Sequence, residues 1–385
     1  MMTKRIKTDA IIIGGGIIGV ATAFYLAREK FGQIILLEKE VLSGAGATSK
    51  AAGGIRAQFS TKVNIEMSIL SEKIMIGFEE ETGHEALFDR VGYMFLLEDD
   101  DDVERFRTDY NLQKSLGLDV QLLNPEDINR YAPHVSLDGI QLASYCPGDG
   151  LGDPHEFLTG YEKGARKLGV EFEFGCEVTG IDTDDNKVTG VRTNRGIISS
   201  PLVINCAGPQ AGMIGKMVDV EVPVQPVRRQ IVTTGELDFV KASFPMVVDV
   251  KSGLYCHKES RGMLLGWADK SVEPSFDVSV DPDYTDAILE KALHRIPLLE
   301  HAEVANEWAG LYEVTPDHHA IIGWEPKVEG MFHVVGFSGH GFMHAPAAGL
   351  VTAQVLTGQE PSVNISKLCP TRFARGVVVE ETNVI

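Results

Sequence analysis

The first hydrophobic run of the chain extends from Ala10 to Ala27 without a charged residue, and Lys4, Arg5 and Lys7 precede it. A run of this length just reaches the ~18 residues of a transmembrane candidate, and its basic start resembles a secretory leader. The internal pattern argues against both. The three isoleucines after Asp9 are β-branched and stop at glycine, which predicts a short buried strand. We therefore interpret the run as a strand and a helix, and expect neither a leader nor an anchor.

Glycines separate this strand from a helix predicted between Val20 and about Lys30. In a G-x-G-x-x-G motif the first glycine permits a tight turn, the second lets a pyrophosphate approach, and the third lets the helix pack closely. A second buried strand, Gln33–Leu37, ends at Glu38, about 20 residues further on, where a carboxylate can bind an adenosine ribose. This β-α-β unit predicts a dinucleotide site with the phosphates at the helix N-terminus. The motif consists of Gly14, Gly15, Gly16, Ile17, Ile18 and Gly19.

Small residues dominate the next stretch, from Ser43 to Gly54. Thr48 and Ser49 can donate hydrogen bonds to a pyrophosphate, and a second glycine-rich segment favours a long, deeply placed cofactor, FAD, over NAD. The alternative is a flexible loop. The residues expected to leave room beside an isoalloxazine ring are Ala52, Gly53 and Gly54.

The later pattern predicts a helix, several strands and a second glycine-rich turn. Asp153 as N-cap, Pro154 and Glu156 start a helix that runs to about Leu168. A glycine-rich turn before a helix over 345–356 can stabilise charge on a reduced flavin near N1 and O2. Strands are predicted at 170–174, 177–181, 188–193 and 197–199, then at 202–206 before Ala207 and Gly208, and over 306–312 within a separate antiparallel sheet from 221 to 319.

These elements predict an α/β fold combined with antiparallel β structure. A Rossmann-like FAD-binding domain of the glutathione-reductase type is expected to alternate along the chain with an antiparallel-sheet substrate domain. The FAD-binding domain is predicted over 1–85, 150–220 and 325–385, and the substrate domain over 86–149 and 221–324.

The composition excludes some classes of binding partner. The 385 residues carry a formal net charge of −20, which argues against nucleic acid and anionic membrane surfaces. The acidic run 99–102 is expected to be a solvated loop. Five widely spaced cysteines without a CxxC pair indicate neither a zinc site nor a disulfide framework, so a cytoplasmic location is expected.

Together, six segments resemble the D-amino-acid-oxidase-like flavoproteins, in the branch of sarcosine oxidases, dimethylglycine dehydrogenases and dye-linked proline dehydrogenase β subunits. They span nearly the whole chain in the family's order. The resemblance implies extended FAD and oxidation of the C–N bond of an amino acid or N-methyl amino acid, by hydride transfer to flavin N5 and hydrolysis of the imine. The segments are IIGGGIIGVATAFYLA, LLEKE, GATSKAAGGIR, VINCAGPQA, WAGLYEVTPDHHAIIG and GFSGHGFMHAPAAG.

The resemblance also assigns roles to single residues. Arg56 matches an arginine beside the flavin near the substrate carboxylate, and a guanidinium can bind a carboxylate bidentately. Tyr255 and Tyr312 match aromatic positions of the substrate cavity, and His340 matches a histidine close to the ring. Further cofactor contacts are expected at Lys39, Ile55, Val178, Ala207, Gly208, Gly310, Gly336, Gly339, His340, Gly341, Phe342 and Met343.

Three departures from the family pattern refine this expectation. Gly310 replaces the cysteine of members with covalent FAD, which predicts non-covalent FAD. Met343 and Leu264 replace two lysines of monomeric sarcosine oxidases, which favours a dehydrogenase that reduces a quinone, a dye or a partner subunit; Lys258 or Lys270 could substitute under another alignment. His155 alone is weak support for a second flavin, FMN.

Three alternatives remain open from the sequence. The first is a related flavoenzyme that oxidises a 2-hydroxy acid or glycerol phosphate, although Arg228-Arg229 is the only clear basic pair for a phosphate. The others are an electron-relay subunit of a larger complex and an NAD enzyme.

Overall fold

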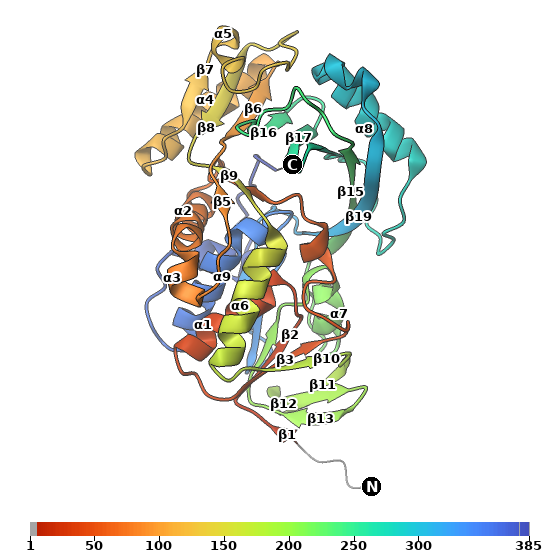
Figure 1. Cartoon of the computed structure of the whole chain (residues 1–385). Helices are drawn as coiled ribbons and strands as arrows, with labels where there is room; N and C mark the ends of the chain where they lie inside the picture. Colours follow the sequence, from red (N-terminus) through yellow and green to blue (C-terminus); the bar gives the residue numbers. More distant parts are fainter. Residues whose placement is uncertain (1–5, 377, 385) are drawn as a thin grey trace.

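The structure, a computed structural model, describes residues 6–376 and 378–384. Figure 1 shows an eight-stranded sheet at the top of the view and a six-stranded sheet with its helices below it. The six-stranded sheet has the order β10-β3-β2-β14-β21-β20 and is parallel except for the β20–β21 pair. Its strands are β2 (Ala10–Ile13), β3 (Ile34–Glu38), β10 (Glu171–Phe174), β14 (Val203–Asn205), β20 (Ile321–Trp324) and β21 (Met331–Val335).

Both faces of this sheet are covered, which explains its uninterrupted hydrophobic strands. Because side chains alternate along a strand, Ala10 and Ile12 pack against helices, whereas Ile11 and Ile13 pack against a four-stranded sheet. The helices on the first side are α1 (Ile17–Arg28), α2 (Lys62–Ile76), α3 (Phe78–Thr82), α6 (Pro154–Lys167) and α9 (Gly341–Leu356). The other side has β1 (Ile6–Lys7), β11 (Val178–Asp184), β12 (Lys187–Thr193), β13 (Gly196–Ser199) and α7 (Ala211–Lys216).

The eight-stranded sheet has the order β19-β15-β18-β17-β16-β6-β8-β7. The predicted antiparallel arrangement is confirmed for every neighbouring pair except β16 and β6, which are parallel. Its strands are β6 (Tyr93–Leu97), β7 (Gln121–Leu123), β8 (Leu142–Cys146), β15 (Gln225–Thr234), β16 (Met246–Asp249), β17 (Leu254–Glu259), β18 (Gly262–Trp267) and β19 (Val304–Val314). Helix α4 (Asp100–Ser115) packs against one face of this sheet, and helices α5 (Pro125–Ile128) and α8 (Pro282–Arg295) pack against the opposite face.

The two predicted substrate-domain segments, 86–149 and 221–324, supply all the strands of this sheet among the residues described. The domain boundaries themselves stay a prediction. A small antiparallel sheet lies between the two halves in Figure 1 and consists of β4 (Gly54–Ile55), β5 (Phe88–Asp89) and β9 (Gly150–Gly152).

Two local predictions are wrong. The acidic run 99–102 is not a loop: Asp99 is the N-cap of α4 and the next three aspartates form its first turn. Carboxylates are stabilised there by the positive end of the helix dipole. Helix α9 starts at Gly341 instead of Ala345, so the glycine-rich turn itself becomes helical and Pro346 lies inside the helix.

Candidate active site

A cavity of about 730 Å³ lies between the two large sheets. At its lower wall are Ile13, Glu38 and Cys206, at the carboxyl ends of β2, β3 and β14. Parallel α/β sheets bind nucleotides at this edge. Its upper wall is the inner face of the eight-stranded sheet, where Ile231 and Tyr255 point toward the cavity. One chamber therefore connects the glycine motif with the second sheet.

The glycine motif shapes the first end of the cavity. Gly14 has a φ of 114°, and a Cβ there would lie 2.3 Å from the carbonyl oxygen of Cys206, so only glycine fits. A Cβ at Gly16 would meet only the hydroxyl of Thr48, at 3.4 Å, and the backbone is bare toward the cavity. The Ile17 N–H donates to Thr48 Oγ1 at 3.0 Å. Gly16, Ile17 and Ile18 all line the cavity, so an anion can still approach the N-terminus of α1 there.

Glu38 is held at the end of β3 by backbone donors. Its Oε2 accepts from the Gly15 N–H at 2.6 Å, and its Oε1 accepts from the Glu40 N–H at 2.9 Å. The carboxylate lines the cavity beside Lys39 and Val178. It occupies the position where the motif predicts contact with a ribose.

The start of α9 forms the middle of the cavity. His340 is its N-cap residue, is 4% exposed, and has a buried Nε2 without a hydrogen-bond partner. Burial, followed by the nearby charges of Arg56 and His344, holds the pKa of His340 well below its usual 6.5, so the imidazole is neutral. Gly339, with a φ of 93°, leaves space for the ring of Tyr312, which a Cβ would approach to 2.4 Å.

A carboxyl group shares this wall. Glu313 lines the cavity, and its Oε2 accepts from the Gly336 N–H at 2.8 Å. Burial raises the pKa of Glu313 to about 7, against the opposing effect of the Gly336 and Phe337 N–H groups. Near neutral pH this group can therefore hold or release a proton.

Three tyrosines line the far end. Burial raises the pKa values of Tyr93, Tyr255 and Tyr312 above the ordinary 10, so their phenols stay protonated. Ile231 and Met246 lie on the same sheet face. This end is apolar with a few hydrogen-bonding groups, as binding sites for small organic molecules usually are.

Arg56 lies behind this end and is 1% exposed. Its Nη1 donates to the carbonyl oxygen of Gln58 at 2.9 Å, and its Nη2 donates to that of Asn383 at 2.5 Å. Its guanidinium carbon lies 3.9 Å from the ring centroid of Phe59, and its buried Nε has no partner. Both terminal nitrogens are thus engaged by the protein, although the residue touches the cavity.

Comparison with known proteins gives the family. Residues 9–355 match the FAD dependent oxidoreductase family, DAO. The chain belongs to this family. L-proline dehydrogenase from P. horikoshii is 30% identical, with a TM-score of 0.90 and 97% of this chain and 99% of that chain covered. Glycine oxidase from Geobacillus kaustophilus is 26% identical, with a TM-score of 0.85 and coverage of 95% and 99%.

A curated relative is longer than this chain. Mitochondrial dimethylglycine dehydrogenase from Rattus norvegicus is 28% identical over 396 residues, which cover 98% of this chain and 46% of that protein. This chain therefore spans about half the length of that relative. Among the described residues, no helix combines the length and apolar character required to cross a membrane.

The cavity of this FAD-dependent family member fits FAD. A Cβ at Gly16 or Gly208 would meet one neighbouring atom each, at 3.4 and 4.0 Å, so the backbone is open toward the cavity at both places. Helices α1 and α9 both begin at its wall, and their first-turn N–H groups suit a pyrophosphate and a flavin ring. His340 adds an unpaired buried nitrogen at the second helix start.

Most of the predicted site residues line this one cavity, although their individual roles stay predictions. They come from both halves of the fold, from strand ends, loops and helix starts. The lining residues are Gly14, Gly16, Ile17, Ile18, Glu38, Lys39, Thr48, Ala52, Gly53, Gly54, Arg56, Val178, Ala207, Gly208, Tyr255, Gly310, Tyr312, Gly339, His340, Gly341, Phe342 and Met343.

Four predicted cofactor residues do not line it. Ile55 follows Gly54 on β4, so alternation turns its side chain into the hydrophobic core, and it is 1% exposed. Gly19 lies where a Cβ would come within 2.0 Å of the Gly14 carbonyl, which agrees with its predicted packing role. The hydroxyl of exposed Ser49 donates within its own turn, and Gly336 donates its N–H to Glu313.

The structure also locates the residues at which this chain departs from the family pattern. Gly310 and Met343 line the cavity, whereas Leu264 is buried within the sheet and does not. Lys258 donates to the Ser260 carbonyl on an exposed hairpin. Exposed His155 lies in the first turn of α6, outside the cavity, and Lys270 is exposed in a turn outside it as well.

Sequence reasoning missed several residues of the cavity, four of which bear on its chemistry or shape. Tyr93 and Met246 lie in strands without a motif, and Glu313 had no signal beyond its place in a matched segment. Arg229 had a usable signal. Arg229 is two positions before Ile231 on β15, so the two side chains point to the same face of the strand. This period could have predicted that the Arg229 side chain faces the cavity.

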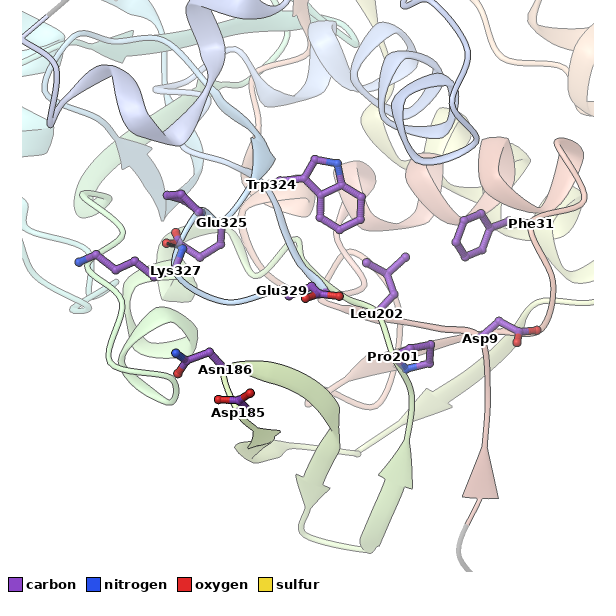
Figure 2. A pocket seen from close by; sticks show the side chains of 12 residues that line it. Asp9, Phe31, Asp185, Asn186, Pro201, Leu202, Trp324, Glu325, Lys327 and Glu329 are labelled. Carbon is purple, nitrogen blue, oxygen red and sulfur yellow. Dashed lines mark hydrogen bonds between the residues drawn. The ribbon is translucent and has the colours of Figure 1, made fainter.

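A second hollow, of about 840 Å³, lies outside this site. Figure 2 shows Trp324 and Phe31 facing it from different elements, with Asp9 and the turn residue Asn186 at its border. Asp9 immediately precedes β2, so this hollow lies at the amino ends of the parallel strands. Nucleotides bind at the opposite edge, and we assign no cofactor role to it.

His344, one turn after His340, predicts a loss of stability in mild acid. Burial, followed by the charges of Arg56 and His319, lowers the pKa of His344 from 6.5 to about 3. Below pH 6.5 the unfolded chain therefore binds a proton that the folded chain excludes, and stability falls as pH falls. Between pH 6.5 and 5 we expect this to remove about 1.5 kcal/mol.

The measurement is urea unfolding of the wild type and of His344→Gln at both pH values. The variant should lose less stability on acidification, because Gln does not titrate. His301→Gln, at an exposed position, serves as the matched control and should behave as the wild type. An identical pH dependence of the wild type and His344→Gln would contradict the buried neutral state.

Proposed function

We propose that this protein oxidises the C–N bond of an amino acid or N-methyl amino acid, such as proline, sarcosine or dimethylglycine, with FAD as the hydride acceptor. The observation that carries the proposal is the single cavity, in which two helix starts adjoin a tyrosine-lined pocket that also contains arginine. A nucleotide and a small carboxylate-bearing molecule can lie end to end in such a chamber.

The similar proteins support this reaction class. L-proline dehydrogenase, glycine oxidase and dimethylglycine dehydrogenase are all named for the oxidation of an amine or amino acid. A glycerophosphate oxidase shares the fold at 19% identity, so the fold alone does not decide between an amine and an alcohol.

The chain's own residues act mainly by positioning. Tyr255 and Tyr312 remain protonated and can donate hydrogen bonds to a substrate, and neutral His340 offers an unpaired Nε2 beside them. When bound, FAD supplies an acceptor for the hydride that leaves the carbon next to nitrogen. The resulting imine takes up water, which gives a carbonyl compound and an amine, or one open-chain molecule with both groups when the substrate is cyclic, as proline is. Apolar Ile231 and Met246 line the same end of the cavity and would limit water around a bound substrate.

We propose non-covalent FAD and a dehydrogenase rather than an oxidase. Gly310 offers no thiol, and a Cβ there would come within 2.5 Å of the Lys50 Cβ, so a larger side chain would require that loop to move. Leu264 stands where the family resemblance places the lysine that speeds reaction with oxygen, and it carries no positive charge. A quinone, a dye or a partner subunit is the proposed electron acceptor. The five unpaired cysteines support a reducing compartment such as the cytoplasm.

The test is anaerobic reduction of the purified protein followed by visible spectroscopy. L-proline, D-proline, sarcosine, dimethylglycine and glycine are added in turn, with L-lactate and glycerol 3-phosphate as comparison substrates. We expect one of the amines to bleach the oxidised flavin band. The bleached protein should reoxidise rapidly with a quinone or dye and slowly with oxygen.

The other outcomes are equally informative. Bleaching by L-lactate or glycerol 3-phosphate alone would replace the proposal by an alcohol oxidation. A protein that contains FAD and is bleached by none of these compounds would contradict the proposal and favour an electron-relay subunit. Release of the flavin on acid precipitation tests the non-covalent attachment.

A further inference from the structure

Two consecutive arginines on β15 have opposite environments. Arg228 points away from the cavity, where its Nη2 lies 3.1 Å from Asp281 Oδ2 and its Nη1 donates to the Ser279 carbonyl at 3.0 Å. Asp281 is the N-cap of α8. Arg229 lies on the other face of the strand, together with Ile231, and lines the cavity. Strand alternation therefore separates a surface ion pair from a cavity cation.

Arg229 is incompletely paired by the protein. One terminal nitrogen donates to the Arg228 carbonyl at 3.0 Å, whereas its buried Nε has no partner. In the described part of the chain no carboxylate lies within ion-pairing distance of its guanidinium. A cation in a largely buried cavity is unfavourable without an opposite charge, so this group is suited to an anionic ligand.

The surroundings of Arg229 match a small carboxylate. Its guanidinium carbon lies 5.2 Å from the ring centroid of Tyr312. Arg229, Tyr255 and Tyr312 all line the cavity, and the charge of Arg229 opposes the rise in pKa that burial causes for both phenols. An unpaired N–H of a planar guanidinium and neighbouring phenols can bind both oxygens of a carboxylate.

Arg56 is less suited to this task. Its two terminal nitrogens already donate to the carbonyl groups of Gln58 and Asn383, and aromatic rings cover it. To bind a ligand with two N–H groups, Arg56 would have to use the same nitrogens that now join two segments far apart in the chain. Arg229 faces the cavity with fewer such ties.

We propose that Arg229, rather than Arg56, binds the carboxylate of the substrate and selects amino acids over simple amines. This inference rests on the proposed function for the identity of the substrate. Arg56 then supports the wall of the cavity from inside the protein.

The experiment compares Arg229→Gln and Arg229→Lys with the matched control Arg228→Gln. Anaerobic flavin reduction is measured with the amino acid that bleaches the wild type and with the amine that lacks its carboxylate, for example L-proline and pyrrolidine. Arg229→Gln should raise KM for the amino acid roughly 30- to 150-fold. It should leave the amine nearly unchanged, Arg229→Lys should be intermediate, and Arg228→Gln should match the wild type.

A second readout does not need turnover. Tetrahydrofuran-2-carboxylate, which has no amine to oxidise, is titrated into each protein while the flavin spectrum is recorded. Its affinity should fall by a similar factor in Arg229→Gln, with FAD content as the check on folding. Unchanged carboxylate affinity, or an equal loss for pyrrolidine, overturns the inference.

The titration also separates this inference from the proposed function. If no amino acid bleaches the wild type, the proposed reaction is wrong. The titration of Arg229→Gln with the carboxylate then still decides the role of Arg229. If the wild type itself does not bind the carboxylate, the role proposed for Arg229 is wrong.

Discussion

Replacing Gly14 by alanine is expected to abolish FAD binding and to lower the free energy of unfolding by more than about 3 kcal/mol. A residue with a side chain is strained at a φ of 114°, and its Cβ would lie 2.3 Å from the Cys206 carbonyl oxygen. That oxygen belongs to the backbone after β14, so relief requires separating two paired strands of the central sheet. The measurements are flavin content after purification and urea unfolding.

The matched control is Gly169→Ala. Gly169 has a similar φ of 93°, but a Cβ there would meet no atom within 4 Å. It tests the backbone strain alone, and we expect a loss of about 1–2 kcal/mol with normal flavin content. If Gly14→Ala retains flavin and is no less stable than Gly169→Ala, the tight approach of β2 and β14 does not have the importance assigned to it.

Replacing Arg56 by methionine is expected to destabilise the protein by about 2–5 kcal/mol, because two buried carbonyl groups lose their donor. These carbonyls belong to Gln58 and Asn383, which are far apart in sequence. Stacking on Phe59 is lost as well. Urea unfolding measures the effect, and hydrogen exchange should show faster exchange in residues 378–384.

Arg28→Met provides the comparison for Arg56. The Arg28 side chain is 46% exposed and pairs with Glu81, and an exposed pair contributes less than about 1 kcal/mol. If Arg56→Met were as stable as the wild type but lost affinity for carboxylates, Arg56 would be the substrate anchor. That result would contradict both the structural role of Arg56 and the role assigned to Arg229.

The nucleotide-binding part of the fold was predictable because its signals are local. β2, the glycine motif, α1 and β3 follow one another within about thirty residues, and each has its own pattern. The start of the helix at Pro154 was equally predictable from Asp153 as N-cap. The structure confirms it, because the Asp153 side chain accepts a hydrogen bond from the His155 N–H. Family resemblance then added the segments that lie apart in sequence.

The details of the site depend on contacts that no local pattern encodes. Arg56 receives its second partner, Asn383, from the other end of the described chain. Ile55 was predicted to contact the cofactor, yet strand parity turns its side chain into the hydrophobic core. The aspartates of α4 resemble a solvated loop by composition, and only their place at a helix start distinguishes them.

The order of strands in the six-stranded sheet has a consequence for how the protein is made. β14 (Val203–Asn205) lies between β2 (Ala10–Ile13) and β21 (Met331–Val335), so neighbouring strands come from the beginning, middle and end of the chain. Such non-local pairing folds slowly and exposes apolar strands meanwhile. We therefore expect the flavin site to close only after synthesis has passed Val335, and nascent chains to need protection from aggregation until then.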